Sequence, residues 1–185
     1  MKKVIIITFI AVFAVINVKA QKYFTKTGQI SFFSSTPIEN IEAVTNSAST
    51  VYDSESGKIQ WAVLIKSFEF EKALMQEHFN ENYMESSKYP KATFKGEIKD
   101  FENLNLDKDG TYLVDVLGDL TIHGVTKPIK SKATFKVLDG KITASSDFNV
   151  FVADYKIEVP AVVKENIAKE IEISIKTEYE LLDRS

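Results

Sequence analysis

Hydrophobic and polar residues alternate with a period of two along most of the chain after residue 21. The alternating stretches are residues 28–36, 49–53, 92–101, 111–123, 127–138, 141–148 and 170–180. This pattern is typical of antiparallel strands that bury one face and expose the other. Turn dipeptides separate several stretches: Ser56-Gly57, Asp109-Gly110, His123-Gly124 and Asp139-Gly140. The pattern therefore predicts a mainly β protein of about eight antiparallel strands.

One segment follows a different period. Over about residues 71–84, side chains such as Met75 and Phe79 recur every four positions, which predicts a helix of about three turns. The preceding residues 59–65 are apolar on both faces, so we expect the helix to cover the outer side of that strand. A second short helical or irregular piece is expected between residues 149 and 166, where no clean period holds.

The predicted strands must protect the edges of their sheet. They can close into a barrel or pair as the two sheets of a sandwich, and periodicity does not distinguish these architectures. The most consistently apolar face runs from Tyr112 to Ile122 in steps of two, with Val116 at its middle. The sequence contains no internal repeat or linker, so residues 21–185 are expected to form a single domain.

The first twenty residues have the three-part pattern of a secretory signal peptide. Two lysines precede an apolar run over residues 4–16, and Val18 and Ala20 place small residues before a cleavage site. We expect cleavage between Ala20 and Gln21 and a periplasmic or secreted protein with no membrane span after removal of the signal. The apolar run is shorter than the roughly 20 residues that a transmembrane helix needs. Cleavage would change the net charge from −3 to −6.

Composition narrows the choice of function. The chain is 44% hydrophobic and 26% charged, as globular domains are, and its acidic balance lacks the basic surface needed to bind nucleic acid. It has no cysteine, which excludes disulfides, thiolate metal sites and a cysteine nucleophile. Oligomeric state, including a homodimer, is left open.

Candidate catalytic and metal-binding residues are few. His78 lies in the predicted helix without the second histidine of a helical zinc site, and His123 lies at a turn. Residues 107–110 resemble the start of a calcium loop, but the twelfth position is Gly118 instead of the bidentate Glu. No phosphate-binding or serine-nucleophile motif occurs. We therefore expect no catalytic residue, no metal and no cofactor, and a carboxylate pair remains the one enzymatic alternative.

Aromatic residues are abundant instead. Residues 21–185 contain eleven Phe, seven Tyr and Trp61, many of them on the inward faces of predicted strands. A small barrel can be filled by these side chains, or it can hold one elongated apolar ligand. Composition leaves both interpretations open.

Two segments resemble a known family. Residues 87–96 (SKYPKATFKG) and 118–129 (GDLTIHGVTKPI) are similar to the strand and hairpin motifs of the YceI-like family of bacterial periplasmic proteins, and residues 148–157 resemble a third motif. The resemblance extends from about residue 61 to residue 179. Residues 23–46 lack the family's N-terminal W-x-[IVL]-D opening and its R-G element.

The resemblance implies a lipocalin-like antiparallel barrel that binds a polyisoprenoid or another long-chain lipid in its lumen, without catalysis. The alternative is a ligand-free sandwich that acts as an interaction or stress-related module. On the first interpretation, the ligand-binding residues are those that line the apolar lumen: Phe32, Trp61, Val63, Ile65, Phe70, Leu74, Phe79, Phe94, Ile98, Val114, Val116, Leu120, Phe135, Phe148, Ile173 and Ile175.

Overall fold

Antiparallel strands make up most of residues 21–182, which are the residues that the computed structural model describes. The strands are β1 (Lys22–Ser35), β2 (Asn40–Asp53), β3 (Lys58–Leu64), β4 (Glu69–Phe70), β5 (Lys91–Ile98), β6 (Gly110–Ile122), β7 (Val125–Leu138), β8 (Lys141–Phe151) and β9 (Glu170–Leu181). The expected signal peptide lies outside the described residues.

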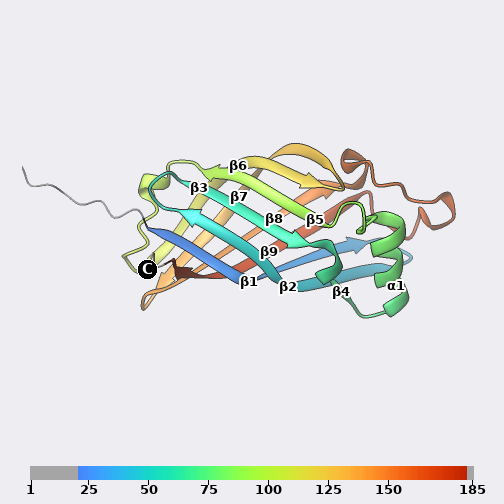
Figure 1. Cartoon of the computed structure of the whole chain (residues 1–185), viewed down its shortest axis with the longest axis horizontal. Helices are drawn as coiled ribbons and strands as arrows, with labels where there is room; N and C mark the ends of the chain where they lie inside the picture. The colour runs from blue at the N-terminus through green and yellow to red at the C-terminus, as the bar shows by residue number, and fades with distance from the viewer. Residues whose placement is uncertain (1–20, 183–185) are drawn as a thin grey trace, which may run out of the picture.

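One sheet closes on itself to form a barrel (Figure 1). The strand order is β1-β9-β8-β7-β6-β5-β3-β2, and β2 pairs again with β1, so eight strands complete the ring. The two-residue strand β4 pairs with β2 at Ala43 and Val44, beyond the part of β2 that pairs with β3. The predicted mainly β, lipocalin-like barrel of about eight strands is confirmed, and the sandwich is excluded as the architecture.

The helix lies across one end of the barrel (Figure 1). It consists of α1 (Ala73–His78) and a π-helical turn, η2 (Phe79–Tyr83), and so falls within the predicted residues 71–84. The expectation that it covers the outer side of β3 was wrong, because Leu64 on that side is 51% exposed. The ring of Phe79 instead packs against three inward phenylalanines, Phe32, Phe68 and Phe70, with ring centroids 5.0–5.9 Å apart.

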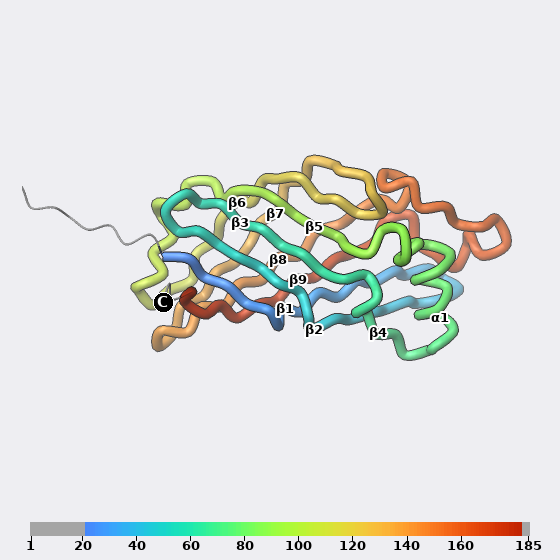
Figure 2. Tube along the Cα trace, in the orientation of Figure 1, coloured from blue at the N-terminus to red at the C-terminus, as the bar shows by residue number. Residues whose placement is uncertain are grey.

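A second covering segment crosses the same end of the barrel. Residues 152–169, here called the strap, contain the 3₁₀ turns η4 (Val152–Tyr155) and η5 (Ala161–Val163) and lead into β9 (Figure 2). The irregular piece expected between residues 149 and 166 is therefore confirmed, although β8 continues to Phe151. Two further 3₁₀ turns connect strands, η1 (Ile65–Ser67) and η3 (Phe101–Asn103).

The opposite end of the barrel is filled by side chains. Aromatic rings of β1, β2, β7 and β9 pack together there, and Phe135 lies 6.0 Å from Tyr179 and 5.8 Å from Tyr52 between ring centroids. The buried residues of this deep cluster are Tyr23, Tyr52, Ile59, Ile98, Leu104, Leu106, Val114, Val116, Ala133, Phe135, Val137, Ile142, Ala144 and Tyr179. The barrel is thus packed at one end and covered by the helix and strap at the other.

Backbone pairing between β7 and β8 stops partway along the wall. The β6–β7 hairpin is paired over its whole length, from Gly110 and Val137 to Ile122 and Val125. The β7–β8 ladder begins at Leu138 and Lys141 but ends at Ala133 and Ser146. Residues 125–132 and 147–151, here called the seam, have no ladder between them among the described residues. The η4 turn of the strap packs against both strands there.

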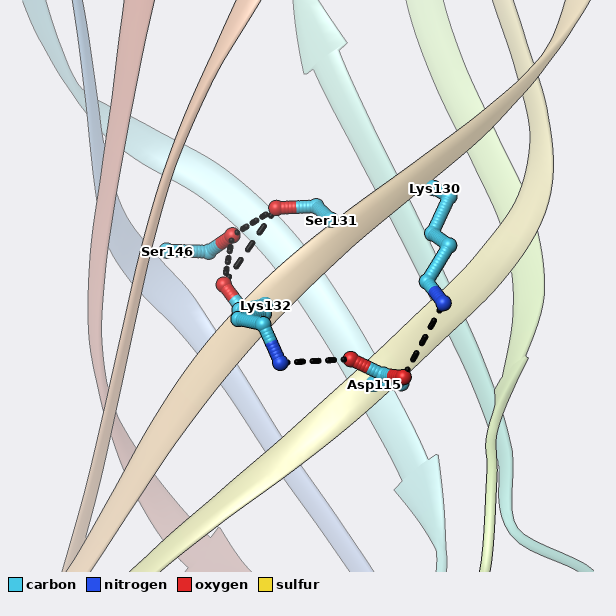
Figure 3. A network of polar contacts seen from close by, with 5 residues as sticks. All are labelled: Asp115, Lys130, Ser131, Lys132 and Ser146. Carbon is cyan, nitrogen blue, oxygen red and sulfur yellow. Dashed lines mark hydrogen bonds and ion pairs between the residues drawn. The ribbon is translucent and has the colours of Figure 1, made fainter.

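Side chains hold the wall together where the ladder ends (Figure 3). Ser146 Oγ donates a hydrogen bond to the carbonyl oxygen of Lys132 at 2.8 Å and lies 2.7 Å from Ser131 Oγ. Asp115 on β6 forms ion pairs with Lys130 at 3.1 Å and Lys132 at 3.2 Å. Hydrogen bonds from these two lysines hold the pKa of the Asp115 carboxyl below its usual range. Between this point and the covered end of the barrel, β7 is therefore paired with β6 and not with β8.

Glycines with positive φ lie in three of the predicted turns, at residues 56–57, 123–124 and 139–140. Among these three glycines, Gly124 leaves the least space for an added Cβ atom. Gly124 has a φ of +72°, and a Cβ added there would lie 2.5 Å from Cε1 of Tyr89. A side chain at this position would be strained by the backbone and would also displace the Tyr89 ring.

We expect Gly124→Val to lower the free energy of unfolding by about 1–3 kcal/mol, measured by urea denaturation. Gly140→Val is the matched control, because Gly140 has a φ of +76° but no atom within 4 Å of an added Cβ. Gly140→Val should lose only the backbone contribution. Equal losses in the two variants would contradict a role for the contact with Tyr89.

Candidate functional site

An internal cavity of about 550 Å³ occupies the barrel between the deep cluster and the covering segments. Every one of the eight barrel strands contributes inward side chains to its wall, and α1, η2 and the strap contribute from above. The wall is overwhelmingly apolar. Both its size and its lining are in the range of sites that bind small or elongated organic molecules.

The structure places fourteen of the sixteen predicted lumen residues on the cavity wall. They are Phe32, Trp61, Val63, Ile65, Phe70, Leu74, Phe79, Phe94, Val116, Leu120, Phe135, Phe148, Ile173 and Ile175. Ile98 and Val114 do not line the cavity; they point inward but belong to the deep cluster. Their strands continue below the cavity floor, where aromatic rings fill the barrel.

Other cavity residues were missing from the predicted set. Ile122, Ile129 and Ile171 line the wall, and their alternation with polar neighbours had already placed them on inward faces. Ser131 and Ser146 also line it, and serine carries no hydrophobic signal. The strap contributes lining residues that follow no period and could not be found from a pattern: Val152, Tyr155, Ile157, Val159, Val163, Asn166 and Ile167.

Charged groups on the wall lie near the covered end. Glu39, in the turn between β1 and β2, lies 3.7 Å from Lys72 Nζ, just before α1, and accepts a hydrogen bond from Asn166 of the strap at 3.2 Å. The strap is also held by the backbone N–H of Ala168, which donates to Ser34 Oγ at 2.9 Å. Glu39 therefore connects both covering segments to the same turn.

His123 connects a third loop to this end. It is 9% exposed with a φ of +51° at the tip of the β6–β7 hairpin. Its Nδ1 lies 3.2 Å from the carbonyl oxygen of Tyr155 in the strap, and its Nε2 lies 2.9 Å from a carboxylate oxygen of Glu85, after η2. The Tyr89 ring packs edge-on against the imidazole, with centroids 4.4 Å apart. Both ring nitrogens therefore have protein partners, which indicates a structural role at the turn.

The titratable side chains on the cavity wall are Glu39, Lys72, His78, Tyr83, Tyr155 and Tyr179. His78 lines the cavity, but no three His, Cys, Asp or Glu side chains within residues 21–182 lie close enough to share a metal ion. Burial raises the pKa of the Tyr52 and Tyr179 hydroxyls above the usual range, so both phenols are neutral at physiological pH. The Tyr179 hydroxyl lies 3.2 Å from Thr50 Oγ1. Polar groups at the deep end thus stabilise the packing.

The fold and the cavity define a class of protein: a small closed antiparallel barrel with an apolar internal cavity. Within this class, the chain belongs to the YceI-like family, because the model of the YceI-like domain matches residues 13–179. The resemblance stated from the sequence motifs is confirmed.

A curated relative and two solved structures are similar to the chain. A UPF0312 protein of Pseudomonas savastanoi pv. phaseolicola is 41% identical over 56 residues, which is 30% of this chain and 26% of the relative. The match therefore spans about a quarter of that relative's length. A polyisoprenoid-binding domain from Saccharophagus degradans, implicated in plant cell wall breakdown, superposes with a TM-score of 0.77 at 18% identity, covering 89% of this chain and all of that one. BcnA of Burkholderia cenocepacia gives 0.68 at 17% identity, covering 83% and 96%.

At these identities the two structures establish the barrel fold. None of the helices within residues 21–182 combines the length and hydropathy that crossing a bilayer requires.

Proposed function

We propose that the protein binds a long apolar molecule, a polyisoprenoid or another lipid, inside the barrel and without catalysis. The observation that carries this proposal is the apolar cavity of about 550 Å³ above the packed end of the barrel. The structural similarity to a polyisoprenoid-binding domain supports the ligand class. On this proposal, the fourteen predicted residues on the wall contact the apolar chain.

The energetics favour a long chain. Burying roughly ten methylene-sized groups contributes on the order of 8 kcal/mol, at about 0.8 kcal/mol each. Association costs at least about 4 kcal/mol in translational and rotational freedom. A short apolar molecule would therefore bind weakly, whereas a chain that fills the cavity binds usefully without strong polar contacts. The nearly uniform apolar wall fits such a ligand.

The proposal is tested by extracting the purified protein with organic solvent and identifying the extract by mass spectrometry. A stoichiometric apolar compound, recovered from protein made in more than one host, is the expected result. Delipidated protein should then take up a long-chain prenol in a titration. If no host supplies a compound and no prenol binds, the lipid-binding function is wrong, and a ligand-free interaction module is the better interpretation.

We further propose that the protein acts in the cell envelope or outside the cell as a single domain of residues 21–185. The support is the signal-peptide pattern of the first twenty residues together with the family assignment. Mass spectrometry of protein recovered from the periplasm or medium should show an N-terminus at Gln21. Protein that retains Met1 and fractionates with the cytosol would contradict this proposal.

A further inference from the structure

Two large aromatic rings lie next to each other on the cavity wall. β3 and β5 pair with Trp61 directly opposite Phe94, and both side chains line the cavity. Both also pack against the deep cluster. Above it, Trp61 packs on the cluster that includes Val63, and Phe94 packs on the cluster that includes Leu120. The two rings therefore lie where the deep cluster meets the cavity, together with members of that cluster that also line the wall, such as Val116 and Phe135.

Glycines on β1, β5 and β6 make room for both rings. A Cβ added at Gly28 would lie 3.0 Å from Cζ3 of Trp61. Gly96 and Gly118 are paired with each other across β5 and β6, and a Cβ on either would lie 2.5–2.6 Å from Cζ of Phe94. The rings thus occupy space that side chains at these positions would fill. Because these glycines have no side chain, the backbone itself leaves the space for the two rings and fixes their positions.

The opposite wall is lined by small side chains. β3 and β8 are four strands apart in the ring of eight, so they lie across the barrel from each other. On β8, the inward residues here are Ala144, which belongs to the deep cluster, and Ser146, and both line the cavity. An eight-stranded barrel is just wide enough to be filled by its side chains. Large rings on one wall and small side chains on the opposite wall therefore set the width of the cavity at this level.

We propose that Trp61 and Phe94 determine the longest apolar chain that the cavity accepts. The inference rests on the proposed function, because it concerns the same cavity. Each methylene that enters is expected to tighten binding about fourfold, from about 0.8 kcal/mol per group. Once the end of the chain reaches the rings, further methylenes remain outside and the gain stops. Affinity plotted against chain length should therefore rise and then reach a plateau.

The test uses delipidated protein and straight-chain fatty acids of increasing length as probes, with dissociation constants from calorimetric titration. Phe94→Ala and Trp61→Leu should move the plateau to longer chains, with a gain of about fourfold for each added methylene that enters. Ala144→Leu narrows the bore from the opposite wall and should move the plateau to shorter chains. Phe101→Leu is the matched control: Phe101 packs against the deep cluster but does not line the cavity, so the plateau should stay in place.

The outcomes separate this inference from the proposed function. If the unmodified protein binds no fatty acid of any length and no prenol, the proposed function fails. If it binds them but the plateau stays at the same length in Phe94→Ala, Trp61→Leu and Ala144→Leu, the function stands and the role of the rings is overturned. A uniform loss of affinity at all lengths would indicate damage to the fold and would equally contradict a length-setting role.

Discussion

Val116→Trp is expected to weaken binding of a long-chain prenol by about 60-fold. Val116 lies midway along β6 and points into the deep end of the cavity. An indole there would exclude roughly three methylene groups of the ligand, each contributing about 0.8 kcal/mol. The extra ring would occupy ligand space, so the melting temperature of the delipidated protein should change little. Both quantities are measured on delipidated protein, by titration and by thermal unfolding.

Leu113→Trp provides the control on the same strand. Leu113 points to the outside and is 65% exposed, so a tryptophan there should alter neither binding nor melting. A Val116→Trp variant that melts far lower, combined with an unmodified protein that never takes up prenol, would mean that the interior is close-packed. Overpacking of a filled core costs about 1–3 kcal/mol, and the lipid-binding proposal would then be abandoned.

Phe135→Ala is expected to lower the free energy of unfolding by about 3–5 kcal/mol. Phe135 is 1% exposed and packs between Tyr52 and Tyr179, with its ring nearly parallel to that of Tyr179 (9° between planes). Removing the ring takes away its contacts with Tyr52 of β2 and Tyr179 of β9 and leaves a hole at the packed end of the barrel. Chemical denaturation measures the effect.

Phe151→Ala is the matched control for this prediction, because Phe151 is 52% exposed at the end of β8. Its effect should stay within about 0.5 kcal/mol. Similar losses for the two substitutions would show that the aromatic cluster does not anchor the barrel.

The barrel could be predicted from local patterns because a strand sends successive side chains to opposite faces. Val116, Leu120 and Ile173 were assigned to the inside on that basis, and the structure places them there. Closure of the sheet was not predictable, because the pairing of β1 with β9 joins segments that are distant in sequence. The motif resemblance was needed to favour the barrel over the sandwich.

The sequence pattern predicts which side chains point into the barrel, but it does not predict how far along the barrel axis each of them lies. Ile98 and Val114 lie in the same inward rows as Phe94 and Val116, yet they fall at a level that rings from β1, β2 and β9 fill. A local sequence pattern does not show which aromatic rings from distant strands pack together. The position of the helix depended in the same way on the phenylalanines it contacts, and the strap follows no period at all. Interactions between distant segments decided each of these features.

The incomplete ladder between β7 and β8 has a consequence for how the barrel fluctuates. Opening the wall along the seam breaks no backbone ladder. It requires that the strap move aside, that the links of Ser146 and His123 break, and that the apolar cluster shared by β7, β8 and the strap separate. Such a partial opening has a lower free energy than global unfolding, so we expect this side of the wall to be less protected than the fully paired β6–β7 hairpin. Amide hydrogens that face the seam should exchange with deuterated solvent sooner than those of the fully paired β6–β7 hairpin. The wall can therefore open transiently along the seam while the strands at the packed end of the barrel stay paired.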